Sequence, residues 1–221
     1  PSPGEALPCG APEIWSDLTN VRKDDILFID AESSWPLENS PVIFRPVSAI
    51  TYQDDGVEAW RATTEMQTIL SQHEGQRGLF HIASYALMAR LRHALHSPRI
   101  RWETSKDDLA DWFHASPPGS VLASCKRYEG FDAPYLVDFQ IIPKVLFPSL
   151  GDPLTAARAK ANPAWYRQVA IDSTVQAIGR AVRAEDDKGV TYILDKALAR
   201  LLDQQVAGFP AWVRKAIQVG V

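Results

Sequence analysis

The sequence lacks several features that would assign it to a specialised class of protein. It has only two cysteines, Cys9 and Cys125, and neither lies in a Cys-x-x-Cys pair, so a disulfide framework is excluded and a reducing, cytoplasmic setting is expected. No apolar run approaches the roughly 20 residues that cross a membrane, and no charged-then-apolar signal segment opens the chain. The first residue is proline rather than methionine, which suggests a processed or excised piece.

What the chain does contain is typical of a globular protein. Its 221 residues are 46% hydrophobic and 23% charged, which is enough to bury a core. The formal net charge of −4 argues against a protein that coats nucleic acid wholesale, but it leaves room for a local basic track.

Short apolar runs alternate with helical patterns from residue 41 onward. Strands are predicted at residues 42–47, 79–83, 99–102, 121–123, 139–142 and 190–194, and helices at 57–73, 84–95, after 105, from 163 to about 184, and from about 197. Asn162 and Pro163 mark one helix start, and Ser105 is expected to cap another. Continuous apolar strands between helices predict one α/β domain, a mostly parallel sheet with helices on both faces. Residues 1–40, rich in proline, serine and acids, are expected to be a lead-in segment.

Candidate functional residues gather in the loop after the predicted strand at 121–123 and in the helix before the last strand. In that helix Gln176, Arg180 and Arg183 share one stripe at helical spacing. Two arginines on one rigid helix suit the bidentate binding of a polyphosphate. A simpler interpretation stays open, in which they form a solvated basic face answered by the acids at 185–187.

The order of several motifs resembles one known family. Residues 176–195, which begin Gln-Ala-Ile-Gly-Arg-Ala-Val-Arg, closely resemble motif VI and the following strand of superfamily 2 DNA helicases of the XPD/DinG type. Residues 78–85 resemble motif IV, residues 124–132 resemble motif V, and residues 139–153 resemble the segment between motifs V and VI. The resemblance covers roughly residues 33–218, and the motif order makes it specific.

The resemblance implies that residues 41–221 form the second of two RecA-like domains, with ATP in the cleft between them and single-stranded DNA lying across both. The first domain would carry the Walker A loop, the acidic motif that binds Mg²⁺ and usually a four-cysteine iron–sulfur cluster. This chain has no Gly-Lys dipeptide and only two cysteines. ATP and Mg²⁺ would therefore be bound mainly by the absent first domain, and no iron–sulfur cluster is expected here.

The resemblance also implies roles for individual residues. Arg183 would be the arginine finger that reaches the γ-phosphate, Arg180 its companion, and Gln176 a positioning group for the helix and the attacking water. Gly179 would let the nucleotide approach, Asp132 would accept from the ribose hydroxyl, and Glu129 and Gly130 would shape that loop. For the loop, a plain strand-end turn capped by acids remains the alternative.

On the DNA side, Ser84 and Tyr85 would touch the backbone at a helix N-terminus. Lys126 and Arg127 stand in a run, 125–128, that departs from the family's usual Pro-Ser-Met-Thr, and their charges could compensate on a phosphate track. Between Glu74 and Glu103 the chain has five arginines and no acid, which predicts either a backbone-tracking groove or merely a basic helix edge.

Other candidates are weaker. His93 and His96 are spaced like metal ligands but have no convincing third ligand, so no metal site is expected. Cys125 has no identifiable His–Asp partnership, which argues against a nucleophile. The expected function is the second motor domain of an ATP-dependent helicase that translocates along single-stranded DNA. The alternative is a standalone, non-catalytic RecA-like module that binds nucleic acid or a partner motor.

Overall fold

A single parallel sheet organises the chain in the computed structural model, which describes residues 16, 21–27, 35–51, 53–54, 56–106, 108–126 and 130–220. Its seven strands lie in the order β3-β4-β2-β5-β6-β1-β7, and every neighbouring pair is parallel. The strands are β1 (Val42–Ser48), β2 (Gly78–His81), β3 (Ile100–Trp102), β4 (Val121–Ser124), β5 (Phe139–Ile142), β6 (Val190–Asp195) and β7 (Ile217–Val219). The predicted α/β class and parallel sheet are confirmed.

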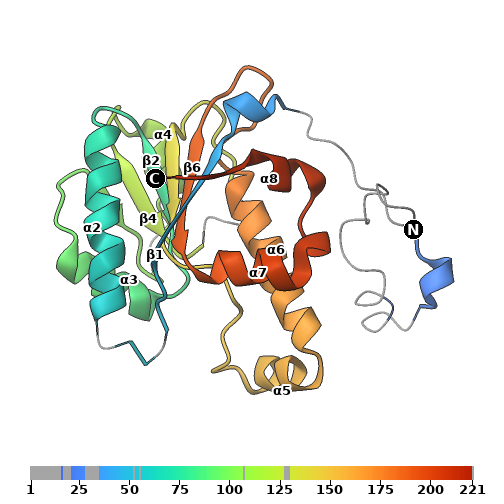
Figure 1. Ribbon diagram of the computed structural model, residues 1–221. Helices are drawn as coiled ribbons and strands as arrows, with labels where there is room; N and C mark the ends of the chain where they lie inside the picture. The colour runs from blue at the N-terminus through green and yellow to red at the C-terminus, as the bar shows by residue number, and fades with distance from the viewer. Residues whose placement is uncertain are drawn as a thin grey trace.

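Helices cover both faces of the sheet (Figure 1). They are α2 (Val57–Gln72), α3 (Tyr85–Ala94), α4 (Ala110–Ala115), α5 (Pro153–Ala161), α6 (Pro163–Ile178), α7 (Ala197–Gln205) and α8 (Ala211–Ala216), with short 3-10 turns η1 (Lys23–Asp25), η2 (Leu37–Asn39) and η3 (Val206–Gly208). Because side chains alternate along a strand, Phe80 packs with α2 and α3 on one face while Leu79 packs with α4 on the other. A cluster of buried hydrophobic side chains under α6, α7 and α8 covers the rest of that opposite face.

The helix starts test two of the predictions. Asn162 caps α6 as expected, since its Oδ1 accepts from Trp165 N at 2.9 Å, and Pro163 follows in the first turn. The prediction that Ser105 is an N-cap is wrong, because α4 begins only at Ala110. The buried Glu103 carboxylate instead accepts from Leu109 N at 2.9 Å, so a residue at the end of β3 stabilises that helix start.

The expected lead-in segment, residues 1–40, falls mostly outside the described residues. Where it is described, Asn39 joins it to the loop before β6: its carbonyl accepts from Gly189 N at 3.0 Å, and its side-chain amide donates to Glu185 O at 3.0 Å. None of the helices in the described part of the chain combines the length and apolar character that crossing a membrane requires.

Candidate functional site

The two arginines of the predicted phosphate-binding stripe lie beyond the end of α6. We predicted a helix to about residue 184, and this is wrong, because α6 ends at Ile178 and Gly179 is its C-cap. Gln176 lies exposed in the last turn, whereas Arg180 and Arg183 belong to the loop that leads into β6. The expected single helical stripe of Gln176, Arg180 and Arg183 therefore does not exist.

Gln140 in β5 contacts the end of α6. Its side chain is fully buried, and its Nε2 donates to the carbonyls of Ala177 and Ile178, both at 2.9 Å. Both carbonyls also accept from the backbone of the following turn, from Arg180 N at 3.0 Å and Ala181 N at 3.3 Å, so the Gln140 amide reinforces the end of the helix from the neighbouring strand. On its other side Gln140 Oε1 lies 3.0 Å from His81 Nε2, and Thr191 Oγ1 lies 2.7 Å from Gln140 Nε2.

The loop after α6 directs both guanidinium groups at one short segment between β4 and β5. Arg180 Nη1 donates to Phe131 O at 2.5 Å, and Arg183 Nε lies 2.8 Å from Asp132 Oδ1. Asp132 is 69% exposed and Arg183 is 37% exposed, so this ion pair is open to solvent. The structure thus brings together Arg180, Arg183 and Asp132, which the resemblance had linked through a nucleotide.

Asp187 fixes the two loops to each other. This buried carboxylate accepts from Arg183 N at 2.9 Å and Lys188 N at 2.9 Å within its own loop, and from Tyr135 N at 3.2 Å across the gap. An acid held by three backbone donors is structural, so the interpretation of residues 185–187 as solvated acids that answer a basic helix face does not hold for Asp187. Sequence reasoning missed this role because an acid after a helix looks the same whether it turns inward or outward.

The glycines beside the arginines leave open space. Gly130 is exposed and has a φ of +62°, a conformation that favours glycine. A Cβ on Gly179 would meet only ordinary contacts at 3.6 Å, so the fold itself does not demand glycine there. Glu129 and Arg127, both singled out in the sequence, lie outside the described residues.

The predicted DNA contacts follow the carboxyl ends of the strands, at the opposite edge of the sheet from the loop with Arg180 and Arg183. Ser84 follows β2 and caps α3, where its Oγ accepts from Leu87 N at 3.2 Å, and the next residue, Tyr85, is 41% exposed. Lys126 follows β4, and its Nζ donates to Ser105 O at 3.2 Å. These residues stand where strands end, whereas Arg180 and Arg183 stand just before β6 begins, so the structure sorts the predicted site residues into two groups.

Comparison with known families agrees with this arrangement. The family described as "Helicase C-terminal domain" matches residues 66–216. The chain belongs to this family. Three solved structures share its fold: an XPD helicase (TM-score 0.61, 20% identity, covering 74% of this chain), an apo XPD (0.63, 18%, 86%) and S. tokodaii Xpd4 (0.58, 14%, 82%).

This helicase domain is shorter than the XPD chains that share its fold. The matches cover 33%, 44% and 38% of the XPD helicase, the apo XPD and Xpd4 respectively. No curated protein sequence matches the chain. The family match confirms the resemblance to a helicase C-terminal domain, and the XPD structures, at 20% identity or less, confirm the RecA-like fold alone.

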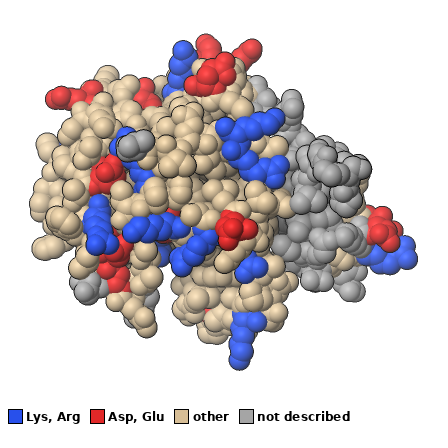
Figure 2. Space-filling view, viewed as in Figure 1, with Lys and Arg blue, Asp and Glu red and all other residues tan. Residues whose placement is uncertain are grey.

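The arginine-rich stretch of this helicase domain is mostly structural. Arg99 donates to the carbonyls of Leu70, His73, Gln76 and Gly119, and Arg77 donates to Ser116 O. Arg90 forms an ion pair with Asp54. Figure 2 shows Lys and Arg interspersed with Asp and Glu on the face drawn. This use of the side chains disfavours a continuous basic groove over residues 75–102. Arg92 and Arg101 are the exposed members of the stretch, and each lies beside a pocket.

The weaker candidates in the sequence are Cys125 and the pair His93 and His96. Burial raises the pKa of the Cys125 thiol to about 12, which opposes a nucleophilic thiolate at neutral pH. Within the described part of the chain, His93 and His96 do not form a group of three or more His, Cys, Asp or Glu residues that could hold a metal.

Proposed function

We propose that this chain is the second RecA-like motor lobe of an ATP-dependent helicase that translocates along single-stranded DNA, with Arg183 as its arginine finger. The observation that carries the proposal is the convergence of Arg180 and Arg183 on residues 131–132, which leaves a guanidinium partly open to solvent. A planar guanidinium makes two parallel hydrogen bonds to phosphate, which suits it to a γ-phosphoryl group.

In this mechanism Arg183 leaves Asp132 and binds the nucleotide instead. Without nucleotide, Asp132 holds the Arg183 guanidinium in position. When a first lobe presents ATP, the γ-phosphate takes over the guanidinium and the Asp132 carboxylate accepts from the ribose hydroxyl. Arg183 then stabilises negative charge on the transferring phosphoryl group, an effect of about 10³-fold or more in rate.

The neighbouring residues support that step. Arg180, held by Phe131 O, fixes the turn and adds positive charge. Gln176 is exposed one turn before and would position the surroundings of the attacking water, and Gly179 and Gly130 would let the nucleotide approach. Glu129 would shape the same loop.

At the opposite edge, the DNA backbone would lie across Ser84, Tyr85 and Lys126, and Arg127 would add a further positive charge. The amide groups at the start of α3 and the Lys126 ammonium are suited to phosphate. Since this chain contains no Gly-Lys dipeptide, the first lobe would bind ATP and Mg²⁺ through its Walker A and acidic motifs. Closure of the lobes on ATP and their reopening after hydrolysis would then step the motor along the strand.

The test assembles this chain with a first motor lobe and measures DNA-stimulated ATP hydrolysis. We expect negligible hydrolysis by this chain alone. In the assembled motor, Arg183→Ala should lower turnover by about 10³-fold and leave nucleotide binding largely intact. The matched control is Arg61→Ala, which removes another solvent-accessible arginine ion pair, to Glu58, in α2.

Three results would contradict the proposal. Substantial turnover by this chain alone would rule out a lobe that depends on a partner. Unchanged turnover in Arg183→Ala would remove the finger assignment. DNA binding without any hydrolysis in the assembled protein would favour the non-catalytic module.

A further inference from the structure

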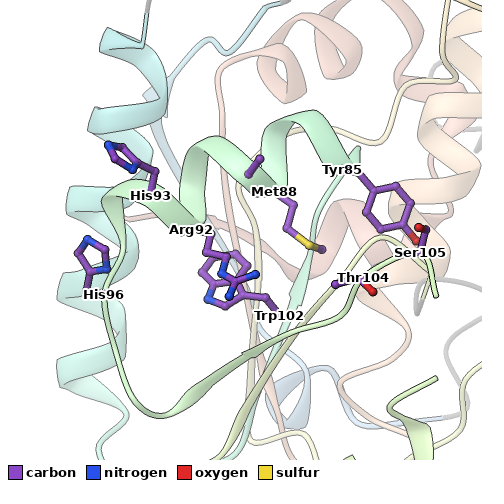
Figure 3. Close-up of a pocket in the computed structure, with 9 residues that line it drawn as sticks. Tyr85, Met88, Arg92, His93, His96, Trp102, Thr104 and Ser105 are labelled. Carbon is purple, nitrogen blue, oxygen red and sulfur yellow. The ribbon is translucent and has the colours of Figure 1, made fainter. Parts of the chain in front are cut away.

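A pocket of about 560 Å³ opens between α3 and the chain segment that follows β3. Figure 3 shows its lining residues, with Tyr85, Thr104 and Ser105 at one end, Met88, Arg92 and Trp102 in the middle, and two histidines at the other end. The residues from α3 recur at helical spacing, so one face of this helix forms one wall. The roles assigned above account for Tyr85 alone among these residues.

The chemistry of the lining is specific. Trp102 is partly buried and packs against the main core, and Met88 is buried, so the pocket has a flat and largely apolar floor. Arg92 is exposed at the wall and supplies a positive charge. Among the described residues that line the pocket, none is acidic. A flat, apolar ligand that carries a negative charge matches this surface.

The pocket adjoins the edge of the sheet at which the DNA backbone would lie. Tyr85 belongs both to the pocket and to the proposed track, and Ser105 at the rim accepts from Lys126 Nζ at 3.2 Å. A strand whose phosphates follow Lys126 and the start of α3 therefore passes the mouth of the pocket.

We propose that this pocket takes one base of the single strand, turned out of the stack, with Trp102 as its stacking platform and Arg92 on an adjacent phosphate. This rests on the proposed function, because it needs a strand on the track. Base–aromatic stacking is tolerant of sequence, since every base has a π-face, so the pocket would hold any base between translocation steps. It would thus add a contact to bases at an edge where the other proposed contacts are to phosphates.

The test compares two labelled 12-nucleotide strands by fluorescence anisotropy, one of thymidine and one of abasic residues with the same phosphates. We expect the chain to bind the thymidine strand roughly 5- to 150-fold more tightly, the range that stacking of one base implies. Ala89→Phe places a ring in the pocket from an exposed position on α3 and should bring this ratio to about 1. Ala94→Phe makes the same change on the same helix outside the pocket lining and should leave the ratio unchanged.

Further variants separate the base contact from the phosphate contacts. Trp102→Ala should bring the ratio of affinities for the thymidine and abasic strands to about 1, and Trp102→Phe should retain most of it. Thermal unfolding is measured to verify that each variant folds. Arg92→Gln and Lys126→Ala should weaken both strands alike and reduce the salt dependence of binding. If Lys126→Ala weakens both strands but Ala89→Phe changes neither, the track stands and the base pocket is overturned. If neither strand binds in a salt-dependent way, the proposed DNA track fails as well.

Discussion

The guanidinium Nε of Arg183 lies 2.8 Å from Asp132 Oδ1, and this pair joins the loop before β6 to the loop before β5. Both side chains reach solvent, so the attraction between them is screened and weak. A weak pair suits a residue that must release its carboxylate when a phosphate arrives. The same geometry buried from water would lock the arginine instead.

A double-mutant cycle on this pair provides the first prediction. Arg183→Ala and Asp132→Ala should each lower the free energy of unfolding by at most about 1 kcal/mol, with a coupling energy in the same range, as measured by urea denaturation. The Arg61–Glu58 pair serves as a control for the coupling energy, which should fall in the same range, whereas Glu58→Ala alone should cost more because Glu58 also accepts from Ala49 N at 2.6 Å. A coupling energy of about 3 kcal/mol would identify the Arg183–Asp132 pair as a structural lock and contradict its availability to a nucleotide.

The second prediction concerns Gln140, which acts on the arginine loop through the end of α6. Gln140→Leu removes the buried side-chain donor to Ala177 O and Ile178 O, which then rely on the backbone donors Arg180 N and Ala181 N. It also removes the buried partner of His81 Nε2 and Thr191 Oγ1, and should lower the free energy of unfolding by about 2–4 kcal/mol. Hydrogen exchange at the Arg180 and Ala181 amides should accelerate as the helix end loosens.

Ile142→Val is the matched control for Gln140→Leu, since it trims a buried side chain on the same strand and face. It should cost about 1 kcal/mol without changing exchange in the arginine loop. Equal exchange rates at the Arg180 amide in the Gln140→Leu variant and the wild type would show that the Gln140 side chain does not position the loop.

The contrast between Asn162 and Gln140 explains which parts of the fold the sequence could predict. Asn162 and Pro163 start α6 through contacts three residues away, so the signal is local and was found. The end of α6 is reinforced by a side-chain amide 37 residues upstream, and no local pattern contains that information. α5 has a local start signal, because Asp152 accepts from Thr155 N at 2.7 Å and Pro153 follows, but it buries no residue and so shows no apolar stripe. β7 is a three-residue edge strand, too short to give a pattern.

The candidate site likewise has one part that the sequence predicts and one part that it does not. The order of the motifs predicted that Arg180, Arg183 and Asp132 belong to one site, and the structure places them in contact across about 50 residues of chain. The buried orientation of Asp187 could not be predicted, because an acid in a run of three acids carries no sign of which one turns inward.

Asp187 leads to the third prediction. Asp187→Ala removes the acceptor for three backbone amides and should destabilise the fold by about 2–4 kcal/mol, with faster hydrogen exchange at Arg183 and Tyr135. Asp186→Ala is the matched control, because Asp186 is exposed and its carboxylate accepts from the Tyr135 hydroxyl at 2.7 Å rather than from these backbone amides. Similar losses of stability in the two variants would mean that burial of Asp187 contributes nothing specific to the loop.

The fourth prediction concerns the pH dependence of stability and arises from His81. This side chain is fully buried, and burial lowers the pKa of its imidazole to about 4, with the Arg180 charge acting in the same direction. Since Gln140 Oε1 accepts, the proton of the neutral ring is assigned to Nε2, and Nδ1 has no hydrogen-bond partner in the described part of the chain. Protonation of Nδ1 would therefore bury a charge that nothing compensates.

The sign of this pH dependence follows from comparing the folded and unfolded chains. Above pH 6.5 His81 is neutral in both states, so it adds no slope. As the pH falls from 6.5 toward 4, the unfolded chain binds a proton that the folded chain refuses, and the folded state loses up to about 3 kcal/mol. Urea denaturation across this range should show that loss in the wild type and a flatter profile in His81→Asn, which keeps a donor but does not titrate. Parallel profiles for the two proteins would mean that His81 already takes up its proton in the folded chain, and the buried neutral link between β2 and Gln140 would have to be abandoned.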